Sequence, residues 1–298
     1  MFWLYLVVLA NLISAIVILI DTYLVGPRAI GKSEVYAFYI GLLSIVVLVM
    51  VPYGSVTLPG INIIIIALVV GLSYMASIIA FYKALQISHP SDVAPALGAV
   101  TAISSYIFGY FFLASTLSQS FFLAFVLLVT GTFLMSYFHF TKLSLLYIVA
   151  AGVLFGYSSV FLKILFAETS FANAFFWSRI ANVFWALTIL LIPVSARAVL
   201  KNVRTASRKT KSLVLVNKAL AGVAAFLIFI ALKLSSNISL VNALAGVQFV
   251  FLLLFAFILP KKYPHYFEET KTMRGKSRIL HRIVATILVI TGFFVLFL

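Results

Sequence analysis

The chain has 298 residues, of which 64% are hydrophobic and only 9% are charged, with a formal net charge of +15. A soluble domain carries about 25% charged residues, so this composition excludes an ordinary water-soluble protein and favours apolar helices in lipid. The absence of cysteine excludes disulfides and thiolate chemistry. The four histidines are scattered singly, which predicts neither a metal site nor a cofactor.

Apolar runs separated by turn or charge signals predict ten transmembrane helices in an all-α protein. The first run lacks the basic start and the small-residue cleavage site of a signal peptide, so it is expected to remain as the first span. Only the connections 195–212 and 260–278 are long. The expected spans, in chain order, are 3–24, 35–52, 61–86, 92–114, 119–138, 144–166, 171–194, 213–233, 238–259 and 279–298.

The two halves of the sequence match each other across one junction between spans. Residues 84–88 (ALQIS) align without a gap on residues 231–235 (ALKLS), at a shift of 147 residues, which is close to half the chain. Self-similarity at such a period indicates an internal duplication. We therefore expect two five-helix units, residues 1–141 and residues 142–298.

Basic residues predict that the second unit is inverted relative to the first. The connections 53–60 and 115–118 have no Lys or Arg, whereas their counterparts 195–212 and 260–278 carry six each. Basic connections stay cytoplasmic, so equivalent connections fall on opposite sides of the membrane, and both chain ends fall outside the cytoplasm. The excess charge next to spans favours anionic lipid as a partner at 195–212 and 260–278, rather than nucleic acid.

The sequence at these junctions resembles the EamA-type transporters of the drug/metabolite transporter superfamily. In the first half, Tyr82-Lys83-Ala84-Leu85 leads into Val93-Ala94-Pro95-Ala96-Leu97, and in the second half Ala231-Leu232-Lys233-Leu234 leads into Ser239-Leu240-Val241-Asn242-Ala243-Leu244. The resemblance implies two inverted five-helix repeats and a secondary transporter. It would move a small metabolite, such as an amino-acid-like or nucleoside-like solute, by alternating access as a multi-pass protein of the plasma or inner membrane.

Arg179 is the main candidate for binding a solute, because it lies inside the predicted span 171–194. An Arg at the centre of a span costs about 2.5–3.5 kcal/mol on insertion scales, so another interaction must offset that cost. One interpretation is an anion anchor in a wet cavity, with Asn182 beside it at i+3. The alternative is a structural pair, or a side chain that extends to the membrane interface.

Four further residues complete the predicted substrate site. Asn11 and Asn242 are amides inside predicted spans, where each needs a hydrogen-bonding partner. Tyr74 and Tyr157 lie deeper than the usual interfacial tyrosines, so each could stack on a planar or apolar solute.

Two pairs of residues favour structural interpretations. Gly152 and Gly156 have the spacing of close helix packing. Asp21 and Lys163 occupy equivalent positions in the two halves, and solvation at helix ends is the favoured explanation for both.

Two other classes of function stay open beside a carrier that is not an enzyme. A lipid flippase or channel is compatible with the same fold. A membrane enzyme acting on a lipid would need clustered acids, and convergence of Asp21, Asp92 and Glu168 in one pocket would favour it.

Overall fold

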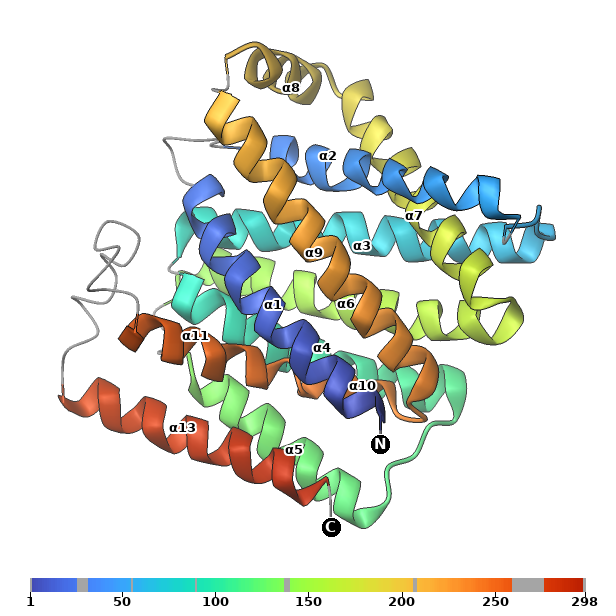
Figure 1. Cartoon of the computed structure of the whole chain (residues 1–298). Helices are drawn as coiled ribbons and strands as arrows, with labels where there is room; N and C mark the ends of the chain where they lie inside the picture. The colour runs from blue at the N-terminus through green and yellow to red at the C-terminus, as the bar shows by residue number, and fades with distance from the viewer. Residues whose placement is uncertain are drawn as a thin grey trace.

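The computed structural model describes residues 2–25, 32–54, 56–88, 90–136, 140–205, 208–258 and 276–296. Within these ranges the chain is all-helical and contains no β-strand (Figure 1). The elements are α1 (Phe2–Val25), α2 (Ser33–Leu43), the 3-10 helix η1 (Ser44–Tyr53), α3 (Ile61–Ile87), α4 (Pro90–Leu113), α5 (Gln119–Leu134), α6 (Lys142–Glu168), α7 (Phe171–Thr188), the 3-10 helix η2 (Ile189–Leu191), α8 (Pro193–Thr205), α9 (Arg208–Leu234), α10 (Ile238–Ala243), α11 (Gly246–Ile258) and α13 (Lys276–Val295).

The surface of the protein is suited to lipid. Seven helices in the described ranges are long and apolar enough to cross a bilayer, judged by length and composition, and three shorter apolar helices accompany them. Large apolar side chains point outward along most of these helices, among them Val46, Phe111, Leu146, Leu215 and Phe294, each more than half exposed. Soluble monomers rarely expose apolar patches of this extent. The chain is therefore an apolar, all-helical protein of the membrane-embedded kind.

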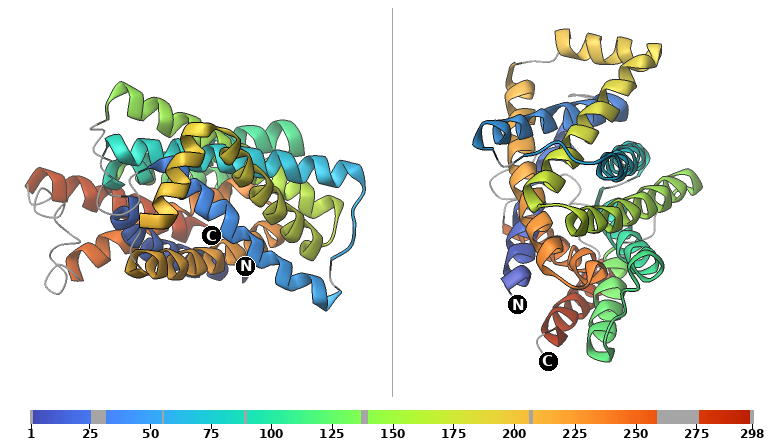
Figure 2. Two further views of the ribbon diagram at one scale, coloured as in Figure 1. Left: turned by 90° about the horizontal axis from the view of Figure 1, so that it is seen from above. Right: turned by 90° about the vertical axis from the view of Figure 1, so that its right-hand side faces the viewer.

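Four helix pairs organise the molecule. α6 packs lengthwise against α3 and α4, α1 packs against α9, and α5 packs against α13. Figure 1 shows α1 and α9 running side by side across one face of the layer formed by α3 and α6. The start of α1 and the end of α13 lie near each other, while α8 lies at the other end of the molecule (Figures 1 and 2).

Small residues allow these helices to approach closely. A Cβ atom added at Gly156 of α6 would lie 2.8 Å from the backbone nitrogen of Ser105 in α4, and one added at Gly152 would lie 2.7 Å from the Cβ of Val100. Contacts under 3.0 Å require the neighbouring helix to move. The packing interpretation of Gly152 and Gly156 is thus confirmed.

The structure differs from the sequence-based expectation in two spans and one connection. The expected span 238–259 is broken between α10 and α11 at Leu244 and Ala245. The connection 195–212 is largely helical. In α8, Val199 is buried while Arg197 and Lys201 are exposed, and the helix is amphipathic, as is typical of membrane interfaces. The expected span 35–52 changes from α to 3-10 geometry at Ser44. Most of the connection 260–278 lies outside the described residues.

Candidate functional site

Arg179 is a cation enclosed by aromatic rings. It is the ninth residue of the 21-residue apolar span Phe171–Leu191, about 12 Å from the start of that span. Its guanidinium carbon lies 4.5 Å from the ring centre of Phe229 in α9, 5.6 Å from that of Phe175 in α7 and 5.7 Å from that of Tyr74 in α3. These are cation–π distances, so the rings offset part of the cost of placing the charge in an apolar span.

The aromatic neighbours do not complete the hydrogen bonding of Arg179. Among the described residues, no carboxylate pairs with it, and its Nε atom is buried without a hydrogen-bond acceptor. The residue as a whole is only partly buried. A guanidinium with an unused N–H can donate a hydrogen bond to a carboxylate or phosphate oxygen, which is the chemistry of an anion-binding group.

Two of the sequence-predicted residues lie beside Arg179. Tyr74 contributes one of the three rings and itself packs edge-on against Phe155 of α6, with ring centres 5.8 Å apart. Asn182 lies one helical turn further along α7, buried, with its side-chain oxygen unpaired in the described part of the chain. An unused donor at Arg179 thus lies one turn from an unused acceptor at Asn182, which is a typical arrangement in a binding site for a polar solute.

Asn11 and Asn242 lie together at the helix break rather than beside Arg179. The amide of Asn11 in α1 donates to the carbonyl oxygen of Leu244 at 2.9 Å. That carbonyl belongs to the turn that separates α10 from α11. Asn242, at the end of α10, is partly exposed, and its side-chain nitrogen is buried with no acceptor among the described residues. Asn11 therefore stabilises the break, and Asn242 keeps an unused donor next to it.

Tyr157 lies apart from both groups. Its ring packs against Phe108 and Phe112 of α4 and against Phe161 of α6, with ring centres 4.3–6.3 Å apart. This aromatic cluster explains the position of Tyr157 without a solute.

Asp21 is not solvated at a helix end, so that expectation is wrong. Its carboxylate is buried and accepts hydrogen bonds from Tyr36 of α2, Tyr82 of α3, and Asn217 and Lys218 of α9. The Lys218 ammonium lies 2.8 Å from the carboxylate, and both side chains are 10% exposed or less. Lys218 could have been found in the sequence, because it is a cation inside the expected span 213–233 and could neutralise an acid in a neighbouring span.

Lys163 is partly exposed beside a surface depression near the end of α6, and its ammonium also has a structural role. Its ammonium donates to the carbonyl oxygens of Leu232, Lys233 and Ser235, at 2.6, 3.2 and 2.5 Å. These carbonyls lie at the C-terminal end of α9, where a helix carries unpaired acceptors and a partial negative charge. Lys163 therefore caps α9.

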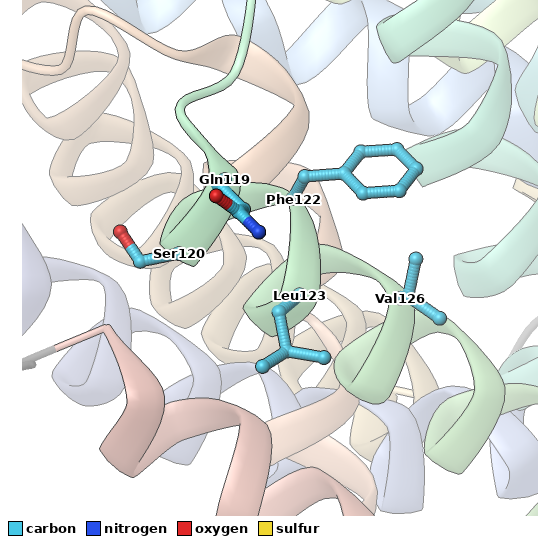
Figure 3. Close-up of a pocket in the computed structure, with 5 residues that line it drawn as sticks. All are labelled: Gln119, Ser120, Phe122, Leu123 and Val126. Atoms are coloured by element: carbon cyan, nitrogen blue, oxygen red, sulfur yellow. The ribbon is translucent and has the colours of Figure 1, made fainter.

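Two surface depressions are separate from Arg179. One, of about 770 Å³, is lined only by residues of α5, and Figure 3 shows its side chains spread along that helix. The other, of about 350 Å³, lies between the end of α4, Lys163 of α6 and the connection between α9 and α10. The first is the outer face of a single helix and provides no enclosure for a solute.

The three acids whose convergence would favour an enzyme have different surroundings. Asp21 is paired with Lys218, and Glu168 is exposed at the far end of α6. Asp92 lies in the first turn of α4. In the described ranges, no group of three His, Asp or Glu side chains is placed to hold a metal ion.

Helices of this length and apolarity, with an aromatic-lined Arg between three of them, define an all-helical membrane-embedded protein with a candidate polar site in its interior. No protein-family model and no curated protein matches the chain. A solved structure described as "Crystal structure of protein" superposes on it with a TM-score of 0.63, covering 97% of each chain at 14% sequence identity. The two proteins share a fold over nearly their whole length.

Proposed function

We propose that this protein is a secondary transporter that moves a small organic solute across the membrane by alternating access, as the resemblance to EamA-type transporters implies. Arg179 carries the proposal. Among the described residues this mid-span cation has no carboxylate partner and keeps a buried unused donor, a cost that a bound anion would offset. The three surrounding rings suit a solute with an apolar or planar body. The substrate class is therefore a small organic anion or zwitterion.

The proposed architecture is ten spans in two inverted five-helix repeats, residues 1–141 and 142–298. Helix pairing supports it: α3 packs on α6, and the equivalent helices α9 and α1 pack on each other. Ring pairs support it as well. The shift of 147 residues places Tyr82 on Phe229, and Tyr82 packs against Tyr36 at 4.7 Å as Phe229 packs against Phe175 at 5.6 Å. In such repeats the solute site lies near the membrane centre between the two units.

The helix break at Leu244 also supports a carrier. Transporters use interrupted helices to present unpaired backbone and side-chain groups at mid-membrane. Here the break is held by Asn11 from the other proposed repeat, and Asn242 has an unused donor beside it. Asn242 is the second proposed solute contact, and Asn11 is its support.

The test is solute flux in vesicles made with the purified protein. Carboxylate-bearing amino acids, nucleotides and aromatic acids are supplied one at a time, and fluorescent phospholipid is included to test the flippase alternative. We expect saturable flux of at least one organic anion. Arg179→Gln should lower it about 10–100-fold, because charge-assisted hydrogen bonds contribute about 1.5–3 kcal/mol. The flux of Arg179→Lys should lie between that of the unaltered protein and that of Arg179→Gln, because lysine keeps the charge but lacks the planar guanidinium.

Lys233→Gln is the matched control. Lys233 also lies over an aromatic ring, that of Phe171 at 5.4 Å, but it is exposed at the end of α9. Its removal should leave flux unchanged. Flux no faster than in empty vesicles across the panel would contradict the carrier, and flux of phospholipid alone would favour the flippase.

A further inference from the structure

The carboxylate of Asp21 collects four donors where four helices meet. Tyr36 and Asn217 donate to one carboxylate oxygen, with the Asn217 amide at 2.5 Å, and the Lys218 ammonium approaches the same oxygen at 2.8 Å. Tyr82 donates to the other oxygen at 3.1 Å. The Lys218 ammonium also lies 4.4 Å from the ring centre of Tyr36. Both oxygens of the carboxylate are thus hydrogen-bonded, one of them by three donors.

This arrangement is more than stability requires. Taking an Asp and a Lys out of water is costly, and well-packed apolar residues of similar volume often stabilise a protein as much or more. Stability alone therefore does not explain why this ion pair is buried.

The donors divide between the two proposed repeats in a way that suits reversible opening. Tyr36 and Tyr82 belong to the same repeat as Asp21, and Asn217 and Lys218 belong to the other. If α9 moves away from α1, the carboxylate keeps two hydroxyl donors. It therefore is not left without partners in either state, which lowers the penalty for breaking the ion pair.

The same end of the molecule is sealed by apolar packing. Leu24, Val35, Phe38, Val199 and Val214 are all buried in one hydrophobic cluster with Tyr36 and Tyr82. Tyr82 and Tyr74 lie eight residues apart on α3, so the ion pair lies about 12 Å along the helix from the ring beside Arg179. Asp21 and Lys218 thus stand between this end of the molecule, which carries α8, and the proposed solute site.

We propose that Asp21, Asn217 and Lys218 form a latch that closes the solute pathway at the end carrying α8, and that the latch opens when α1 and α9 separate. This inference rests on the proposed function for its purpose, but the closure itself can be measured without a known solute. Lys163, the position equivalent to Asp21, has its three bonds in the described part of the chain within its own repeat, so these bonds form no such latch.

The experiment uses a single cysteine as a reporter, which is simple because the chain has none of its own. Phe155→Cys places a thiol on α6 at a partly exposed position that contacts Tyr74. A membrane-impermeant maleimide is added from the side that carries α8, and the rate of alkylation is measured. The double variant Asp21→Asn/Lys218→Met removes both charges without leaving either unpaired. We expect it to raise the rate about tenfold.

Two matched comparisons separate a latch from general loosening. Asn217→Leu removes a bond between the repeats and should raise the rate, whereas Tyr82→Phe removes a bond within one repeat and should not. Glu34→Gln/Lys83→Met removes a partly exposed ion pair of 3.4 Å that joins α2 and α3 of one repeat, and should leave the rate unchanged.

The possible outcomes are distinct. Unchanged alkylation in both the Asp21/Lys218 double variant and Asn217→Leu would overturn the latch, even if solute flux is normal. Equal acceleration in all four variants would overturn it too, because it would reflect loosened packing. Faster alkylation only in the variants that lose a bond between the repeats would support the latch, even if no solute in the flux panel is transported. Failure of the latch and failure of the proposed carrier are therefore distinguishable.

Discussion

Polar side chains inside these apolar helices differ in how completely they are paired. Asp21 has four donors, and Asn11 has a backbone carbonyl at 2.9 Å. Arg179, Asn182 and Asn242 each keep one buried atom without a partner in the described part of the chain. Complete pairing is typical of a structural role, and incomplete pairing is typical of groups that meet a ligand. On this basis Asn11 is assigned as a support, and Arg179, Asn182 and Asn242 are the proposed solute contacts.

A comparison of the two asparagines tests that division. Asn11→Leu removes the donor to Leu244 and leaves a carbonyl unpaired, so it should destabilise the protein by about 1–2 kcal/mol. Asn242→Leu removes a donor that has no acceptor, so it should leave thermal stability in detergent unchanged and reduce solute flux. Equal loss of stability in the two variants would contradict the assignment of Asn242 as a solute contact.

At this scale the sequence predicted positions better than partners. A lone Arg or Asn in an apolar run is visible in the sequence, and so Arg179, Asn11 and Asn242 were candidates before the structure. Phe175 and Phe229 were not, because 29 phenylalanines make any one of them unremarkable. Asp21 was misread since its partners come from α2, α3 and α9, and their convergence depends on tertiary packing.

Glycines allow several helices of this protein to approach each other closely. Gly71 of α3 would place a Cβ atom 2.8 Å from the backbone of Ala181 in α7, two residues from Arg179. Gly156 brings α6 equally close to α4. Close backbone approach is the usual basis of helix association in lipid. The same approach sets the position of α7, and with it the position of Arg179.

Valine substitutions at two glycines test whether close helix packing stabilises the protein. Gly156→Val should separate α6 from α4 and lower thermal stability in detergent by several degrees, because the added atoms meet the backbone of Ser105. Gly222→Val in α9 is the control, since a Cβ atom there meets nothing within 4 Å. If both variants melt at the native temperature, close packing of α6 on α4 does not contribute to stability.

Element boundaries followed from hydrophobic runs, but breaks within runs did not. The ends of α3, expected at 61 and 86, lie at Ile61 and Ile87 because Gly60 and Ser88 flank an unbroken apolar segment. The break between α10 and α11 occurs within Ala-Leu-Ala-Gly, a sequence without proline or charge. The Leu244 carbonyl at the break is bonded by Asn11, which is more than 200 residues away in the chain, so local sequence could not reveal this contact.

At the scale of the whole molecule, the proposed carrier requires two five-helix units of opposite orientation. The Arg179 site, the latch and alternating access all require that equivalent segments of the two units face opposite sides of the membrane. The connection around Leu58 and the helix α8 are one such pair. Leu58 is 90% exposed, and Arg197 of α8 is also exposed, so both can carry a reporter without disturbing the core.

Sided labelling of these two positions tests the central claim most directly. Leu58→Cys and Arg197→Cys are each made as the single thiol of the chain and treated with an impermeant maleimide in sealed cells and in inverted vesicles. We expect Leu58→Cys to react only in sealed cells and Arg197→Cys only in inverted vesicles, since basic segments stay cytoplasmic. Reaction of both positions from the same side would contradict the inverted architecture and remove the basis for the carrier.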